Sequence, residues 1–85
     1  MTLEQIESRL LSAWVSIGAQ LPQKQLDEVS SLTKAGEPRI ALENLCTQSF
    51  EFDASVSKAS RDELGTLGTA MAIRPEYWTR LRVKG

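Results

Sequence analysis

Apolar residues recur three and four positions apart through the first 21 residues and define one helical face. They are Leu3, Ile6, Leu10, Ala13, Trp14, Ile17 and Leu21. Thr2 and Gln5 form a capping box, in which each side chain bonds to the backbone N–H of the other residue. This pattern predicts an amphipathic helix that begins directly after Thr2.

Two further aliphatic residues, Leu11 and Val15, lie about 100° away from that stripe on a helical projection. They either widen the buried face or form a small exposed apolar pair. A domain of this size buries only about 60% of its unfolded surface and needs most of its aliphatic side chains in the core. We therefore expect the wider buried face.

Prolines and a glycine divide the next part of the chain into two helices. Pro22 suits the start of a second helix and Pro38 the start of a third, because proline at the first helical position loses no hydrogen bond. Gly36 is a natural terminator of the second helix. The inner face of the second helix is predicted to carry Leu26, Val29 and Leu32.

The third helix divides into two sides. The core side is predicted to carry Leu42, Leu45, Cys46, Ser49 and Phe52. The outer side is predicted to carry Ile40, Asn44, Thr47 and Glu51, with Glu43 flanking them. Residues 53–57 then have the composition of a loop.

A fourth helix begins at Ser57 or at Ser60, since either serine can serve as its N-cap. Gly65 and Gly68 inside it each cost about 1 kcal/mol relative to alanine, which indicates close helix packing or a loosened turn. Pro75 starts a last short helix. The inner face of the fourth helix is predicted to carry Leu64, Leu67 and Met71. The last helix bears Tyr77, Trp78 and Leu81, with Trp78 on its inner face.

No segment alternates with period two, and no hairpin dipeptide separates apolar runs. The 85 residues are enough for one domain, and 41% apolar with 25% charged residues is the mixture of a folded protein. We predict an all-α fold in which residues 1–85 form a single compact bundle of four to five short helices.

The chain lacks the residues that most catalysis needs. Histidine is absent, and the single cysteine, Cys46, lies on the apolar side of its helix, where a buried small hydrophobe is expected. Zinc would need several Cys or His ligands, and no phosphate-binding loop is present. We predict no enzyme, no metal, no cofactor and no small-molecule substrate, and hence a protein that acts by binding.

The N-terminus carries no basic segment of a secretory signal, and the uncharged residues 10–23 are too few and too polar for a bilayer span. We therefore expect a cytoplasmic protein with no membrane partner.

Charge is balanced overall, at a formal net of −1, but unevenly distributed. Residues 37–63 contain six acidic and three basic residues, whereas residues 74–85 contain four basic residues and one acidic residue. Both spans fit ordinary solvated faces. The acidic span also fits a docking surface for a basic protein, and the basic span a weak nucleic-acid contact.

The outer side of the third helix is the candidate contact. An aliphatic Ile40 among acids and amides has the make-up of an interface, with an apolar centre and a polar rim. The predicted partner-binding residues are Ile40, Glu43, Asn44, Thr47, Glu51 and Asp53. The two tryptophans, Trp14 and Trp78, are expected in the core, although Trp78 beside Tyr77 could instead reach a partner.

Four stretches of the chain together match the pattern of one bacterial family. They are Gly36-Glu37-Pro38 with Ala41-Leu42-Glu43-Asn44-Leu45, Phe50-Glu51-Phe52-Asp53, Leu67-Gly68 after Ser57, and Pro75-Glu76-Tyr77-Trp78. In order and spacing they resemble the MafI-like immunity proteins of polymorphic-toxin and contact-dependent growth inhibition systems. The resemblance spans roughly residues 26–81, and Lys58 stands where that family has proline.

The resemblance implies a small helical antidote that binds the toxic C-terminal domain of a large secreted or surface-displayed protein. Such toxins are frequently nucleases, whose basic clefts an acidic helical face would suit. The leading hypothesis is stoichiometric, non-covalent neutralisation of a cognate toxin. The alternatives are a small helical nucleic-acid-binding or regulatory module, and a structural subunit of a larger complex.

Overall fold

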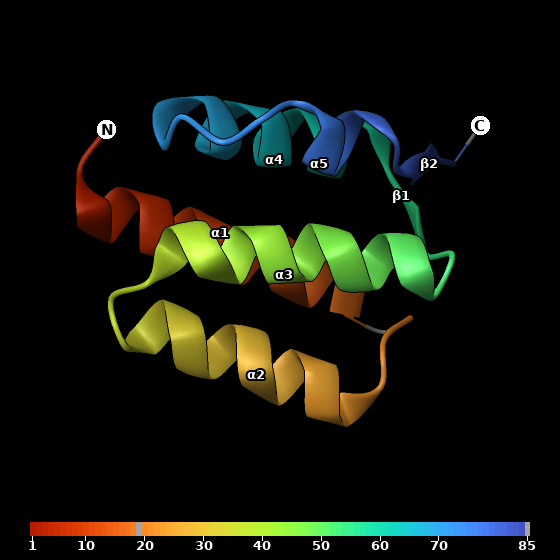
Figure 1. Ribbon diagram of the computed structural model, residues 1–85, viewed down its shortest axis with the longest axis horizontal. Coiled ribbons are helices and arrows are strands. Elements are labelled where there is room, and N and C mark those ends of the chain that lie inside the picture. Colours follow the sequence, from red (N-terminus) through yellow and green to blue (C-terminus); the bar gives the residue numbers. More distant parts are fainter. Residues whose placement is uncertain (19, 85) are drawn as a thin grey trace.

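The computed structural model describes residues 1–18 and 20–84, and within them the chain forms five helices and two two-residue strands (Figure 1). The elements in chain order are α1 (Leu3–Gly18), α2 (Gln23–Lys34), α3 (Pro38–Glu51), β1 (Ser55–Val56), α4 (Lys58–Ala70), α5 (Glu76–Thr79) and β2 (Arg82–Val83). This confirms the predicted all-α class. No helix of the described residues has the length and apolar character that crossing a membrane requires.

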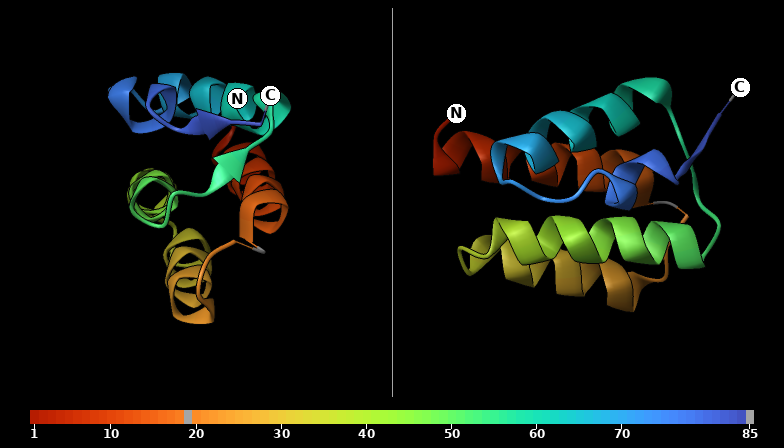
Figure 2. Two further views of the ribbon diagram at one scale, coloured as in Figure 1. Left: turned by 90° about the vertical axis from the view of Figure 1, so that its right-hand side faces the viewer. Right: turned by 45° about the horizontal axis from the view of Figure 1, so that its top comes forward.

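The helices lie in three layers, with α2 in one, α1 and α3 in the middle, and α4 with α5 in the third (Figures 1 and 2). α3 contacts all four other helices, and its largest interface is with α2. α1 packs chiefly on α4 and α2. One long side of α3, along Ile40, Glu43, Asn44, Thr47 and Glu51, stays exposed or half-buried and is called its uncovered side.

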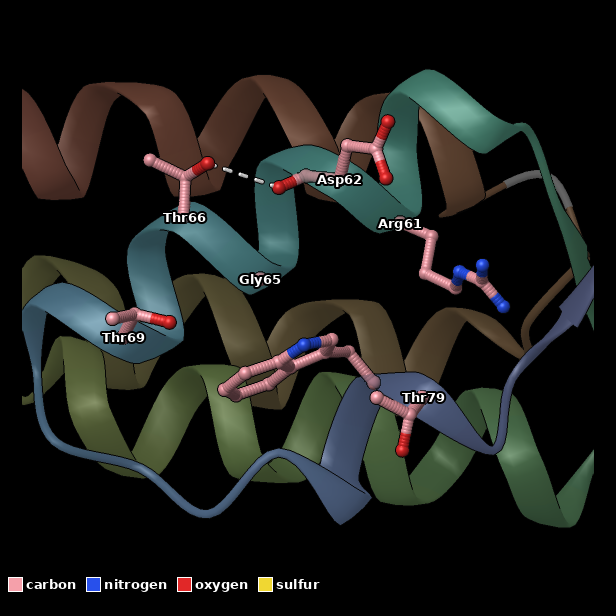
Figure 3. A pocket seen from close by; sticks show the side chains of 7 residues that line it. Arg61, Asp62, Gly65, Thr66, Thr69 and Thr79 are labelled. Atoms are coloured by element: carbon pink, nitrogen blue, oxygen red, sulfur yellow. Dashed lines mark hydrogen bonds between the residues drawn. The ribbon is translucent and has the colours of Figure 1, made fainter.

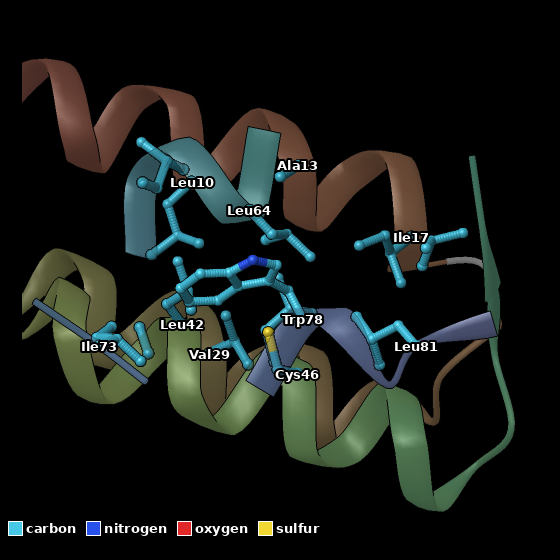
Figure 4. Packing of buried hydrophobic residues seen from close by; sticks show 14 of the residues in the cluster. Leu10, Ala13, Ile17, Val29, Leu42, Cys46, Leu64, Ile73, Trp78 and Leu81 are labelled. Atoms are coloured by element: carbon cyan, nitrogen blue, oxygen red, sulfur yellow. The ribbon is translucent and has the colours of Figure 1, made fainter. Parts of the chain in front are cut away.

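All five helices contribute to one hydrophobic core (Figure 4). Its fully buried centre includes Leu10, Ile17, Leu42, Leu45, Leu64 and Leu67. Trp78 of α5 belongs to the same cluster at 8% exposure, so core packing is confirmed for this ring. Trp14 is half-buried against the core, and its indole N–H donates to the Leu26 carbonyl at 3.1 Å.

The start of α1 follows the prediction, but its apolar stripe is narrower than expected. The Thr2 backbone N–H donates to Gln5 Oε1 at 2.9 Å, and the Gln5 N–H donates to Thr2 Oγ1 at 3.2 Å. The wider buried face is wrong, because Val15 is 67% exposed and Leu11 only half-buried. Leu3, which the sequence placed on the buried stripe, is also 55% exposed and is the first residue of α1.

The glycine at the end of α2 acts as predicted. Gly36 adopts a positive φ of 81°, which glycine tolerates without a Cβ clash. The Glu37 N–H then donates to the Leu32 carbonyl at 3.0 Å and the Gly36 N–H to the Thr33 carbonyl at 3.2 Å. These two bonds form a Schellman motif, which satisfies carbonyls that the helix end leaves free.

The predicted core position of Phe52 is wrong, because this ring is 47% exposed. α3 ends at Glu51, and Asp53 then takes a positive φ of 53° that reverses the chain. The Ala54 N–H donates to the Ser49 carbonyl at 2.8 Å, which turns Ala54 into the core instead. A helical projection continued past the true end of a helix therefore misplaces the next side chain.

Residues 53–57, predicted as a loop, include the strand β1, which pairs in parallel with β2 near the C-terminus. The Lys84 N–H donates to the Val56 carbonyl at 2.8 Å. On β1, the Gln20 carboxamide bonds both backbone groups of Ser55, accepting at 2.9 Å and donating at 2.5 Å. The strand pairing and the Lys84 bond hold the C-terminal segment beside β1, and the Gln20 bonds hold β1 beside the segment between α1 and α2.

The sequence left open which serine caps α4 and why the helix contains two glycines, and the structure answers both questions. The helix begins after Ser57, whose Oγ accepts from the Ser60 N–H at 3.0 Å. Gly65 and Gly68 reflect close packing, because the Trp78 indole lies directly on both. A loosened turn is not needed to explain them.

We expect Ala72→Gly to stabilise the protein by about 1 kcal/mol, because Ala72 holds a positive φ of 57° at the end of α4. Glycine relieves that strain while the Ile73 N–H keeps its 2.9 Å bond to the Gly68 carbonyl. Thermal unfolding followed by circular dichroism should show a melting temperature higher by about 4–8 °C. Ala70→Gly, in the last turn of the same helix, should instead lower it. A melting temperature for Ala72→Gly at or below wild type would contradict this account.

A charge-assisted pair joins α1 to α4. The Arg9 guanidinium donates from Nε to Glu63 Oε2 at 2.7 Å and from Nη2 to Oε1. The hydrogen bond from Arg9 lowers the pKa of the Glu63 carboxyl below its ordinary value. The pair therefore stabilises the fold above the ordinary carboxyl pKa and loses this contribution as pH falls through the lowered pKa.

We expect Glu63→Gln to melt at a lower temperature than wild type near pH 7, where it removes one charge of this pair. The difference should shrink as the pH is lowered from 7 through the lowered pKa of Glu63, because the wild-type carboxyl then becomes neutral as well. Parallel melts of both proteins across that range provide the measurement, with Asp62→Gln, an exposed neighbour, as control. A constant difference at every pH would mean that the ion pair is not its source.

Candidate protein-binding site

The uncovered side of α3 follows the predicted division of this helix. Ile40 is 45% exposed and Glu51 is also exposed, whereas Glu43, Asn44 and Thr47 are half-buried along the same stripe. The opposite side carries the buried Leu42, Leu45, Cys46 and Ser49. Five of the six predicted contact residues thus share one face of a single rigid helix.

The sixth predicted residue, Asp53, lies beyond the end of α3 and faces the C-terminal strand. Its carboxylate Oδ1 lies 3.1 Å from Nη2 of Arg82 in β2. The negative charge of Asp53 is therefore offset by a neighbour that lies 29 residues further along the sequence.

Phe50 is a member of this surface that the sequence reasoning missed. Its ring is 49% exposed, and the guanidinium carbon of Arg80 lies 4.2 Å from the ring centroid. This distance is that of a cation–π contact. The sequence spacing could have predicted this position. Phe50 follows Glu43 by seven residues, which is two helical turns, and it therefore returns to the same side of the helix.

A shallow groove lies where α5 packs beside α3. Its lining residues are Thr47, Arg74, Glu76, Tyr77 and Arg80, and its volume is about 230 Å³. Phe50 borders it through the contact with Arg80. The acidic and basic spans, which the sequence presents as separate surfaces, are therefore neighbours in the folded chain.

The single cysteine lies beneath this surface and is fully buried. Burial raises the pKa of the Cys46 thiol to about 12, with Arg80 acting to lower it and Glu43 to raise it. At neutral pH the side chain is a neutral thiol, as expected for a small hydrophobe of the core.

A larger open depression of about 780 Å³ lies on the other side of α5, over the Trp78 indole (Figure 3). Its lining residues are Arg61, Asp62, Gly65, Thr66, Thr69, Trp78 and Thr79. The Thr66 hydroxyl is engaged with the Asp62 carbonyl at 3.1 Å, within α4. The depression is thus a shallow, open surface above a packed ring.

No protein-family model, curated protein or solved structure matches this chain. The resemblance to MafI-like immunity proteins accordingly stays a prediction that rests on the four sequence stretches alone.

Proposed function

We propose that this chain is a cytoplasmic immunity protein that neutralises a cognate bacterial toxin domain by stoichiometric non-covalent binding. The toxin activity that we propose is that of a nuclease. The observation that supports it best is the uncovered side of α3, where Ile40 is 45% exposed between Glu43, Asn44 and Glu51. An apolar centre with an acidic rim suits a basic protein surface, such as the substrate cleft of a nuclease.

The size of a stable interface extends this proposal beyond α3. A standard complex buries about 800 Å² on each partner, which is about a sixth of the 4842 Å² surface of this chain. α3 has 14 residues, and one side of such a helix, about 21 Å long and 10 Å wide, offers a far smaller area. Residues from the elements beside α3 must therefore contribute to the contact.

Two of the four basic residues in the span 74–85 lie beside an acid, which favours a protein partner over the nucleic-acid alternative. Arg82 is paired with Asp53 at 3.1 Å, and Arg74 lies 3.9 Å from the Glu76 carboxylate. Acids interleaved with the cations lower the potential that a phosphate backbone would meet.

The decisive experiment is co-expression of this chain with the C-terminal domain encoded by the gene immediately upstream. The proposal expects the cells to survive and the two proteins to co-purify at a fixed stoichiometry. Cell death despite a folded and abundant chain, with no complex, would exclude that partner. Retention of the chain on heparin at moderate salt would then favour the nucleic-acid module.

A further inference from the structure

The groove between α3 and α5 differs in charge from the stripe beside it. Two of its five lining residues are arginines, Arg74 and Arg80, and one is an acid, Glu76. The Glu76 carboxylate offsets the charge of Arg74 alone. Its Oε2 lies 3.9 Å from Arg74 Nε, and both side chains are more than 70% exposed. No ion pair of Arg80 occurs among the described residues, so this groove presents excess positive charge.

We infer that this groove receives a carboxylate side chain, Asp or Glu, from the toxin domain, and so forms the second half of the toxin-binding surface. The inference rests on the proposed function and adds to it the chemistry of the partner at this position. It also adds contact area beside the uncovered side of α3.

The geometry of Arg80 is the main support. Contact with the Phe50 ring at 4.2 Å restrains the guanidinium, so less side-chain entropy is lost when it binds. A guanidinium presents its N–H donors in a planar fork that matches a carboxylate. The Thr47 and Tyr77 side chains, which line the same groove, provide hydroxyl donors beside that position.

The two halves together define an interface with two signs of charge. Glu43 and Glu51 on the uncovered side of α3 would meet basic residues, while Arg74 and Arg80 along its α5 edge would meet an acidic one. Such an arrangement permits one orientation of the partner, because a reversed or shifted partner would bring like charges together.

The test measures the affinity of the purified toxin domain for variants of the full chain by titration calorimetry. We expect Arg80→Glu to weaken binding at least about tenfold, because it places a like charge against the carboxylate. Arg80→Lys, which keeps the charge but loses the planar fork, should weaken binding less. Lys24→Glu, an exposed reversal in the first turn of α2, is the matched control and should bind as wild type does. Circular dichroism should show all three variants folded.

The outcomes separate this inference from the proposed function. Wild-type affinity of a folded Arg80→Glu, alongside loss of binding on reversal of Glu43 and Glu51, would overturn the groove and leave the immunity role standing. Tighter binding by Arg80→Glu would also overturn the inference, because the partner would then place a basic residue in the groove. If Arg80→Glu instead abolished binding of a single-stranded oligonucleotide by the wild-type chain and left toxin binding intact, the groove would be assigned to nucleic acid. A wild-type chain that binds no toxin domain would remove both proposals.

Discussion

Gly68→Ala should destabilise this protein by about 3 kcal/mol, because the added methyl group would overlap a buried ring. A Cβ at residue 68 would lie 2.1 Å from Cζ3 of Trp78 and 2.7 Å from its Cη2, well inside van der Waals contact. The indole cannot swing aside cheaply, because Trp78 is 8% exposed and packs within the core (Figure 4). Against a total stability of about 5–15 kcal/mol, this loss should lower the melting temperature by about 12–24 °C.

Two matched substitutions show whether the clash is the cause. Gly65→Ala places its Cβ 3.0 Å from Nε1 of Trp78, a tight contact that the better helix propensity of alanine partly offsets. It should change stability by about 1 kcal/mol or less. Thr69→Ala, exposed on the same helix, should be nearly neutral.

A double variant provides the second check. Trp78→Phe removes part of the ring that a methyl group at residue 68 would strike, so the combination with Gly68→Ala should lose less stability than the sum of the single losses. Strict additivity, or a Gly68→Ala protein as stable as wild type, would show that Trp78 does not occupy this position.

Reversal of both acids on the uncovered side of α3, Glu43→Lys with Glu51→Lys, should abolish protection against the toxin while helicity and melting stay unchanged. Glu51 is exposed and Glu43 half-buried, so lysine can keep its charge in solvent at both positions. If the toxin surface is basic, each reversal replaces an attraction with a repulsion and also slows encounter. Cell survival on co-expression and calorimetry with the purified domain are the measurements.

The matched control is Asp27→Lys with Glu28→Lys, which changes the net charge by the same amount at two exposed positions on α2 instead of α3. This variant should protect as wild type does. Full protection by the folded Glu43 and Glu51 variant would displace the binding site from α3 without affecting the role. Loss of protection in both variants would point to net charge as the cause.

Several helix boundaries were predictable because their causes are local. The capping box of Thr2 and Gln5, the positive φ of Gly36 and the proline at the start of α3 act within a few residues of their own positions. The periodic apolar stripe similarly identified the buried side of α3 and the outward position of Ile40. Five of the six candidate contact residues therefore share the face that the sequence assigned to them.

The errors arose where a side chain's environment depends on distant elements. Val15 looked like a core residue by size, yet no neighbouring helix reaches it, and it is 67% exposed. Phe52 fits the helical period, but the chain reverses at Asp53 and leaves the ring half in solvent. The glycines of α4 indicated that another side chain packs closely on this helix, but the sequence did not identify it. It is Trp78, ten residues beyond Gly68.

The sequence by itself determined an all-α chain, the principal ends of its helices and the uncovered side of α3, because helix propensity, capping and periodicity act over short distances. Only the tertiary structure brought Arg80 onto Phe50 and Arg82 to Asp53, since those contacts depend on how α5 packs and how β2 pairs with β1. Two charged spans that are separate along the chain became one surface of mixed charge. That juxtaposition arises from packing between residues about 30 positions apart, which no local pattern encodes.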